Sequence, residues 1–292
     1  MTADALSVGG VPEHFNLPFE DLTEGGHSLL RWQSMPSGTG SMCRALDDGT
    51  LDVAVLLTEG IVRHIHEGSA ARMVGTFTET PLRWGVHVAA DSPVVHEEDL
   101  RALRFGISRS GSGSHLMACI HASSRGWPVP AFEEVGGFEG ARAALREGKI
   151  DAFLHEKTMA LPLVHAGEWR RVAEVSGPWP AFVYAVREGL MQDRAEDVAR
   201  LIRLADEAAG ARASAPDGTV AAIVALHGIP ADDARAWLAE TRWNSRMELS
   251  SGMLDRVTST LARHGLLDAP LPPSDLLAPG VVLRAQGAAG HA

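Results

Sequence analysis

The sequence Ser37-Gly38-Thr39-Gly40-Ser41 follows an apolar segment of strand character and precedes a segment of helical character. The sequence Ser110-Gly111-Ser112-Gly113-Ser114 stands between segments of the same two kinds. In such a turn, glycines let the backbone approach a ligand, hydroxyls donate hydrogen bonds, and the first N–H groups of the helix carry a positive partial charge. Two such turns predict two lobes, with an anion-binding turn at an equivalent place in each.

A second repeat also indicates a duplicated architecture. The segments Ala45–Ala54 and Ala144–Phe153 each have the pattern of a helix end, a glycine, and a buried strand entered through an aspartate. Apolar strands alternate with helical segments through most of the chain, and helical patterns dominate after Arg194. The sequence therefore predicts an α/β fold, with a mainly parallel sheet flanked by helices in each lobe and a C-terminal helical segment.

The same alternation sets the expected boundaries. We expect lobe 1 to comprise residues 1–89 and 182–267, and lobe 2 to comprise residues 90–181. Residues 268–292 are rich in Pro, Gly and Ala, which predicts a disordered tail. Ligands of open α/β sheets bind outside the carboxyl ends of the strands, so a cleft between the lobes is the expected site.

Composition excludes several classes of partner. The chain has 292 residues, of which 45% are hydrophobic and 22% charged, and its net charge is −11. This charge argues against nucleic acid or an anionic membrane as the main partner. No segment reaches the roughly 18 apolar residues of a membrane span, and the N-terminus has no signal-peptide pattern. We therefore expect a cytoplasmic protein, with its oligomeric state left open.

No residue spacing predicts a metal or cofactor. Cys43 and Cys119 lie in helical patterns without a Cys or His at metal-ligand spacing, which indicates buried inert thiols. His64 and His66 are two residues apart, so their side chains leave a helix in different directions. Nucleophile motifs, phosphate-binding loops and dinucleotide fingerprints do not occur.

The chain resembles the type II periplasmic-binding-protein-like superfamily, in the branch of nitrate-, sulfonate- and taurine-binding proteins and thiamine-pyrimidine precursor proteins. The resemblance rests on Val11-Pro12-Glu13-His14-Phe15-Asn16-Leu17, on the two Ser/Gly turns with their helix–glycine–strand repeats, and on Ala234–Leu238 and Thr241–Trp243. It covers about residues 5–267. It implies a two-lobed protein that closes on a ligand in the cleft between the lobes.

Members of this superfamily bind the ligand with the loop after the first strand, the helix starts and the strand ends. The resemblance places ligand-binding groups of lobe 1 at Phe15, Asn16, Ser37, Gly38, Thr39, Gly40, Thr58 and Glu59. It places those of lobe 2 at Ser110, Ser112, Gly113, Ser114, His115 and Glu156. Arg109, just before the second turn, is either a further anion-binding group or a surface cation.

The titratable candidates have open roles. Glu59 and Glu156 either bind a cationic or N–H edge of the ligand, or cap the helix that follows each strand. His115 is the best candidate for a general acid or base, with packing or helix capping as its alternative role. Trp179 is the tryptophan best placed to cover a ligand.

The leading hypothesis is a cytoplasmic solute-binding protein that closes on a small anionic or zwitterionic metabolite. One alternative is a cofactor-independent lyase or dehydratase, in which His115, Glu59 or Glu156 transfers a proton. The other alternative is an exported substrate-binding subunit of an ABC transporter. The N-terminus shows neither a signal peptide nor a lipidation cysteine, which favours sensing, carrying or biosynthesis over transport.

Overall fold

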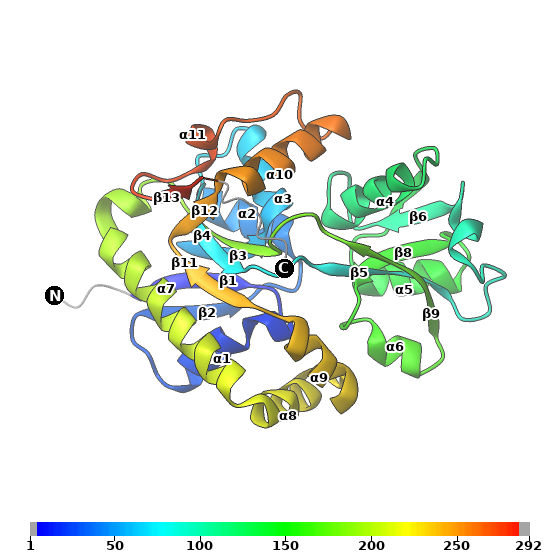
Figure 1. The fold of residues 1–292 in the computed structure, drawn as a ribbon, viewed down its shortest axis with the longest axis horizontal. Helices are drawn as coiled ribbons and strands as arrows, with labels where there is room; N and C mark the ends of the chain where they lie inside the picture. Colours follow the sequence, from blue (N-terminus) through cyan, green and yellow to red (C-terminus); the bar gives the residue numbers. More distant parts are fainter. Residues whose placement is uncertain (1–4, 286–292) are drawn as a thin grey trace. The chain divides into compact units, whose positions relative to one another are not determined.

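The computed structural model describes residues 5–285, which divide into two compact units (Figure 1). Unit 1 comprises the described residues of Met1–Thr80, Pro178–Thr219 and Leu238–Ala292. Unit 2 comprises Pro81–Gly177 and Val220–Trp237. Each unit contains a sheet covered by helices, so the predicted α/β fold class is confirmed.

The sheet of unit 1 has the strand order β11-β4-β10-β3-β1-β2. Its strands are β1 (Leu6–Gly10), β2 (Leu30–Ser34), β3 (Val53–Leu57), β4 (Arg72–Thr78), β10 (Phe182–Val186) and β11 (Trp243–Arg246). β1 is parallel to β2 and β3, and β10 is antiparallel to both β3 and β4. β4 therefore runs in the direction of β3. The carboxyl ends of β1, β2, β3 and β4 lie at one edge, the carboxyl edge of unit 1.

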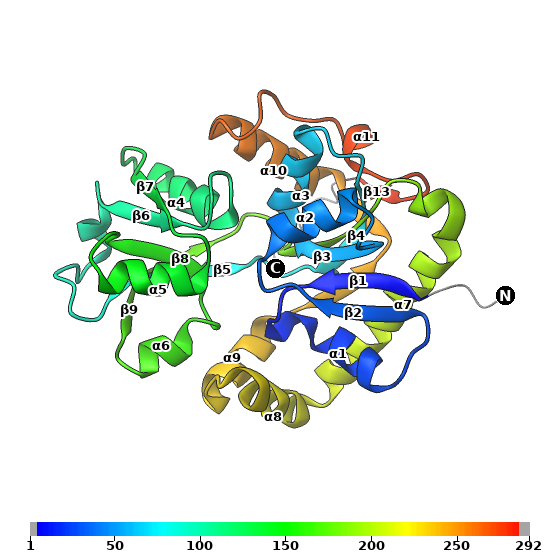
Figure 2. The same cartoon turned by 180° about the vertical axis from the view of Figure 1, so that it is seen from behind.

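Helices cover both faces of this sheet (Figures 1 and 2). The helical elements are η1 (His14–Asn16), α1 (Leu17–Glu24), α2 (Thr39–Asp47), α3 (Thr58–His66), α7 (Leu190–Ser214), α10 (Ser251–Arg263) and α11 (Pro273–Leu276). On the face of α1 and α7, the ring of Phe19 packs 5.4 Å from that of Phe77, and the Tyr184 hydroxyl bonds Ser245 at 2.6 Å. Ser245 in turn donates to the carbonyl of Ile202 in α7, so this buried polar chain is satisfied. α2, α3 and α10 lie on the other face.

The sheet of unit 2 has the strand order β7-β6-β8-β5-β9. Its strands are β5 (Arg83–Ala89), β6 (Arg104–Ile107), β7 (Ala131–Glu134), β8 (Ala152–Glu156) and β9 (Trp169–Ser176). β6 is parallel to β7 and β8, and β5 is antiparallel to β8 and β9. The carboxyl ends of β6, β7, β8 and β9 therefore define the carboxyl edge of unit 2.

The helical elements of this unit include η2 (Glu97–Leu100), α4 (Gly113–Ser124), α5 (Phe138–Arg146) and α6 (Leu161–His165). α4 and α5 lie on opposite faces of this sheet (Figures 1 and 2). The chain passes from β6 to β7 in one direction and from β7 to β8 in the other, and right-handed crossovers in opposite directions place their helices on opposite faces. α5 buries Ala141, Ala144 and Leu145 against Phe153 and Trp169. α8 (Pro216–His227) and α9 (Ala231–Glu240) follow α7 in the chain.

The two sheets share one topology. The order β2-β1-β3-β10-β4 corresponds to β7-β6-β8-β5-β9, with the antiparallel strand at the same place in each. The unit β1-α1-β2-α2-β3 therefore corresponds to β6-α4-β7-α5-β8. The repeat of Ala45–Ala54 in Ala144–Phe153 falls on the equivalent α2–β3 and α5–β8 connections, and Gly49 and Gly148 there have φ of 76° and 66°. A left-handed glycine ends both helices.

The two Ser/Gly turns are not at equivalent places, and this prediction is wrong. The run from Ser37 to Ser41 joins β2 to α2, whereas the run from Ser110 to Ser114 joins β6 to α4. In the shared topology, the β6–α4 turn corresponds to the β1–α1 connection that holds η1. The turns resemble each other in composition, but strand pairing decides their places, and composition does not determine pairing.

Two further segments differ from expectation. β5 pairs with β8 and β9 in unit 2, although the sequence boundary placed residues 1–89 in lobe 1. Part of the expected disordered tail is folded: α11 buries Leu276, and β13 (Val282–Arg284) pairs with β12 (Glu248–Ser250). Burial of Leu276 and Ala278 anchors this segment despite its prolines. Residues 286–292 of that tail lie outside the described residues.

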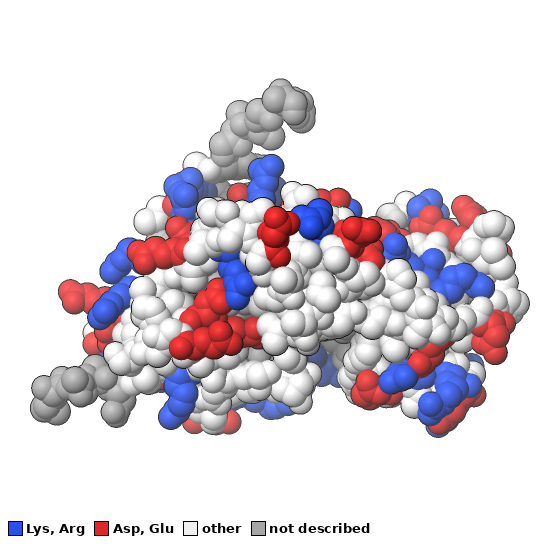
Figure 3. Space-filling view, turned by 90° about the horizontal axis from the view of Figure 1, so that it is seen from below, with Lys and Arg blue, Asp and Glu red and all other residues white. Residues whose placement is uncertain are grey.

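The surface agrees with the acidic composition. On the face shown in Figure 3, Lys and Arg side chains are interspersed with Asp and Glu, and the described residues present no wide basic area there. The helices within residues 5–285 are all too short or too polar to cross a membrane.

Candidate functional site

The β6–α4 turn at the carboxyl edge of unit 2 is held by its own hydroxyls. Ser112 is the N-cap of α4, and its Oγ accepts from His115 N at 3.4 Å and lies 3.0 Å from Ser114 Oγ. Ser114 Oγ also accepts from Ser108 N at 3.0 Å. Gly111 N donates to His115 Nδ1 at 2.8 Å, which assigns the ring proton to Nε2. Both serine side chains are buried, so these hydroxyls have a structural role.

This turn is also tied to the neighbouring strand. Ser110 N donates to Glu134 Oε1 at 2.7 Å, at the end of β7. The first N–H groups of a 12-residue helix have no partner within the helix, and here they belong to Gly113 and Ser114. A fixed helix start at a carboxyl edge is a suitable anion site. Arg109 is half-buried beside it.

The other Ser/Gly turn starts α2 at the carboxyl edge of unit 1. Gly38 is the N-cap, with φ of 72°, and no side chain caps the helix there. Ser41 Oγ donates to Gly38 O at 2.8 Å, and Ser37 is exposed. Thr39 Oγ1 accepts from Leu57 N at 3.4 Å, which ties the start of α2 to the end of β3. Gly40 is buried in the first turn.

Glu59 lies in the first turn of α3 and already has a hydrogen-bond donor. Trp179 Nε1 donates to its Oε2 at 2.8 Å, and the residues are 5% and 2% exposed. Burial raises the pKa of the Glu59 carboxyl above its ordinary value, and the hydrogen bonds oppose this only in part. Thr58 Oγ1 donates to Pro180 O at 2.6 Å. The segment that contains Trp179 is therefore fastened to the start of α3.

Glu156 caps the turn after β8. Its Oε2 accepts from Met159 N at 2.7 Å, and the residue is 4% exposed. Burial raises its pKa to about 7, although hydrogen bonds from Met159 and Thr158 lower it. Glu156 is the last residue of β8, whereas Glu59 lies in α3, after the equivalent strand β3. Of the two roles left open by the sequence, local capping is the one that the Glu156 contact fits, whereas Glu59 binds the Trp179 indole and no side chain caps α3.

Phe15 and Asn16 lie in η1, directly after β1. The Phe15 ring lies 5.1 Å from that of Phe182, and its carbonyl accepts from Trp243 Nε1 at 2.9 Å. Asn16 Nδ2 donates to Val11 O at 2.7 Å. These two residues occupy the place in unit 1 that the β6–α4 turn occupies in unit 2.

Sequence reasoning missed Thr78, the last residue of β4. Its side chain is fully buried at the carboxyl edge, and its hydroxyl has no hydrogen-bond partner within residues 5–285. The sequence did contain a signal for Thr78: it directly follows an apolar strand segment that ends at Phe77. Thr58, which was predicted as a site residue, follows Leu57 in the same way.

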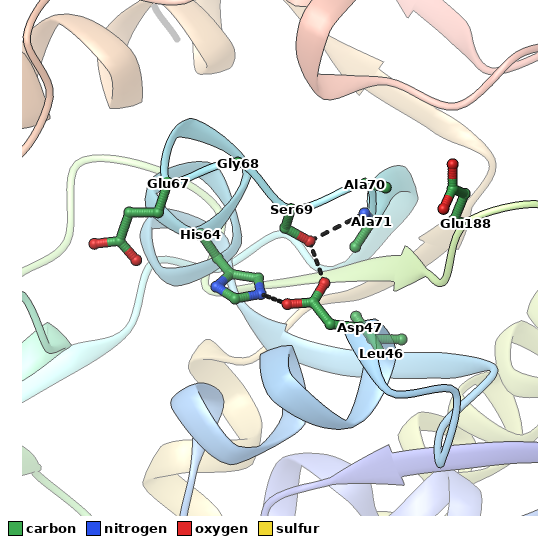
Figure 4. Close-up of a pocket in the computed structure, with 9 residues that line it drawn as sticks. All are labelled: Leu46, Asp47, His64, Glu67, Gly68, Ser69, Ala70, Ala71 and Glu188. Atoms are coloured by element: carbon green, nitrogen blue, oxygen red, sulfur yellow. Dashed lines mark hydrogen bonds and ion pairs between the residues drawn. The ribbon is translucent and has the colours of Figure 1, made fainter.

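A pocket of about 350 Å³ lies at the opposite edge of the unit 1 sheet (Figure 4). Asp47 accepts from Ser69 Oγ at 2.5 Å and bonds His64 Nε2 at 2.7 Å, so both side chains point to one carboxylate. Glu67 is paired with Arg63. None of the predicted site residues lines this pocket.

No group of three or more His, Cys, Asp or Glu side chains among the described residues is arranged to hold a metal ion. Cys43 and Cys119 are buried thiols, and burial raises the pKa of Cys119 above its ordinary value. A buried thiol with a raised pKa is a poor nucleophile.

Residues 84–175 match the model of a family described as Ca3427-like PBP. The Candida albicans CA3427 gene product, described as having the generic periplasmic binding protein fold, superposes with a TM-score of 0.84 at 21% identity, over 97% of this chain and 98% of that one. The alkanesulfonate-binding protein SsuA from Xanthomonas axonopodis pv. citri, bound to MOPS, gives 0.80 at 16% identity, over 98% and 99%. The chain has the type II periplasmic-binding-protein-like fold.

The superfamily resemblance stated from the sequence is thus confirmed. PhnD1 from Prochlorococcus marinus, in complex with methylphosphonate, shares this periplasmic-binding-protein-like fold at a TM-score of 0.61 and 11% identity, over 90% of this chain and 99% of that one. No curated protein matches the chain by sequence.

Proposed function

We propose that this protein is a solute-binding protein for a small anionic or zwitterionic molecule, with the start of α4 at the carboxyl edge of unit 2 as its anion site. The observation that carries this proposal is the start of α4. Ser112 and Ser114 are fixed by hydrogen bonds to each other and to the backbone of His115 and Ser108. This network orients the N–H groups of the first turn, which carry a positive partial charge but no formal charge. A protein with a negative net charge can therefore still bind an anion at this helix start.

Two relatives of the same fold support an anionic ligand. The Xanthomonas protein is an alkanesulfonate-binding protein bound to MOPS, and the Prochlorococcus protein is in complex with methylphosphonate. Sulfonate and phosphonate groups both carry several acceptor oxygens on one centre, which suits a helix N-terminus. We therefore infer that sulfonates and phosphonates are the first solutes to test.

The binding function is preferred to the lyase or dehydratase. All three candidate proton-transfer groups, His115, Glu59 and Glu156, already bind local donors. The cytoplasmic location expected from the sequence stays a prediction, and fractionation of cells that produce the protein tests it.

Calorimetry and thermal unfolding test the proposed function directly. We expect at least one member of a panel of MOPS, methylphosphonate, short alkanesulfonates, carboxylates and pyrimidines to bind and to raise the melting temperature. Binding to the folded state alone stabilises it by about 2.7 kcal/mol at a ligand concentration of 100 Kd. Silence across the whole panel contradicts the proposal.

The variant Gly113→Pro tests the helix start. Proline suits the first position of a helix, and Ser112 before it has the extended backbone, φ −71° and ψ 167°, that a following proline requires. The change removes one N–H donor, so we expect about tenfold weaker binding with little loss of melting temperature. Unchanged affinity in a folded variant removes the start of α4 from the site.

A further inference from the structure

Two buried polar atoms at the carboxyl edge of unit 1 lack hydrogen-bond partners among residues 5–285. They are Asn16 Oδ1 and Thr78 Oγ1, in residues that are 1% and 0% exposed. The large majority of buried side-chain polar atoms in folded proteins are paired, because an unpaired one loses its hydration without compensation. Two such atoms at the edge where ligands of this type of sheet bind indicate groups kept for a partner outside the chain.

The orientation of Asn16 is fixed by its amide nitrogen. Nδ2 donates to Val11 O at 2.7 Å, which identifies Oδ1 as the unpaired atom. A Cβ at Gly10 would stand 2.9 Å from Nδ2, so the amide packs directly over the end of β1. Asn16 is the N-cap of α1 but makes no side-chain cap, whereas Ser112, at the equivalent place in unit 2, caps α4. The Asn16 carbonyl is therefore an acceptor that helix formation does not use.

Thr78 lies in the same neighbourhood. It pairs with Phe182 of β10 on one side and with Trp243 of β11 on the other. Phe15, next to Asn16 in the chain, contacts both of these neighbours through its ring and its carbonyl. On the same strand, Thr76 Oγ1 donates to Glu248 O at 3.2 Å, so only one of these two threonine hydroxyls has a partner in the described chain.

We propose that Asn16 Oδ1 and Thr78 Oγ1 bind a hydrogen-bond-donating group of the solute, so that the solute is an anion that also carries an amine or hydroxyl. This inference rests on the proposed function. An amide oxygen can only accept, so its partner must be an N–H or O–H group. Binding of a cationic or N–H edge, one of the two roles that the sequence left open for Glu59 and Glu156, falls to Asn16 and Thr78, because both carboxyls bind donors of their own chain.

The first experiment needs no ligand and compares Thr78→Val with Thr76→Val. Valine has the shape of threonine without the hydroxyl. Removing an unpaired buried hydroxyl is neutral or stabilising, whereas removing a paired one is destabilising. We expect the melting temperature of Thr78→Val to equal or exceed that of the wild type, and that of Thr76→Val to fall. A fall in Thr78→Val like that in Thr76→Val overturns the inference, because the hydroxyl then has a partner in the free protein, such as a bound water.

The second experiment measures affinity for two matched pairs of probes: aminomethanesulfonate against methanesulfonate, and aminomethylphosphonate against methylphosphonate. We expect the amine-bearing member to bind about tenfold more tightly. In Thr78→Val this advantage should shrink severalfold, while the affinity for the plain anion stays close to that of the wild type. In Thr76→Val the affinities for both members of each pair should stay close to those of the wild type. Equal binding within each pair, or an advantage that survives in Thr78→Val, overturns the inference and leaves the proposed function standing. If no anion of the wider panel binds, the proposed function fails and takes the inference with it.

Discussion

Single hydroxyls at the carboxyl edges have different tasks, although the sequence shows them only as parts of Ser/Gly runs. Ser112 Oγ caps α4 by accepting from His115 N. The resemblance placed Ser112 among the ligand-binding groups, and in that role its replacement by alanine would weaken binding and spare stability. Because Ser112 caps α4, we instead expect Ser112→Ala to destabilise the protein, lowering the free energy of unfolding by about 1 kcal/mol.

Urea denaturation checks this prediction, with Ser123→Ala as the control. Ser123 is exposed in the same helix, where alanine is at least as good a helix former. If both variants keep wild-type stability, Ser112 does not act as a cap in solution.

At the scale of the element, one glycine of α5 sets how closely this helix approaches the preceding loop. A Cβ at Gly140 would lie 1.7 Å from Val135 O, closer than any tolerated contact. Gly140→Ala must therefore displace the helix or the loop, and we expect a loss of about 1–3 kcal/mol. A Cβ at Gly210 in α7 would meet no neighbouring atom within 4 Å, and Gly210→Ala should gain about 0.5–1 kcal/mol.

The opposite signs of these two changes form the test, measured as urea midpoints under one condition. Equal effects of Gly140→Ala and Gly210→Ala would mean that α5 has room to move. The close packing of α5 on the β7–α5 loop would then not hold in solution.

The stability of the whole molecule should fall in acid because of a buried imidazole. His87 lies in β5 and is fully buried. Burial lowers its pKa to about 3, with smaller effects of His155 and Arg171. The unfolded chain binds this proton near pH 6.5, so the contribution is complete above that pH and is lost as the pH falls towards 3.

We expect His87→Leu to flatten the dependence of the unfolding free energy on pH below 6.5, by at most about 1.4 kcal/mol per pH unit. Glu156 acts in the opposite direction, because its raised pKa favours the folded state below its ordinary pKa of 4.5 and loses this effect as the pH rises to about 7. Comparison of the variant with the wild type cancels that effect. Parallel pH profiles would show that His87 is protonated in the folded protein.

The sequence by itself determined the local features of this protein. Alternating apolar strands and helices predicted the α/β class, and the glycines after α2 and α5 marked the true repeat. It also directed attention to Asn16 and the β6–α4 turn. These features depend on residues close in the chain, whose periodicity and backbone preferences are read directly.

Tertiary structure alone decided which strands are neighbours and which polar atoms are satisfied. Strand order separates the two Ser/Gly turns, and pairing places β5 in unit 2. Trp179 reaches Glu59 across 120 positions of sequence, while Thr78 is left without a partner in the described chain. Pairing and burial depend on contacts between distant segments, and a residue's own neighbours in sequence do not encode them.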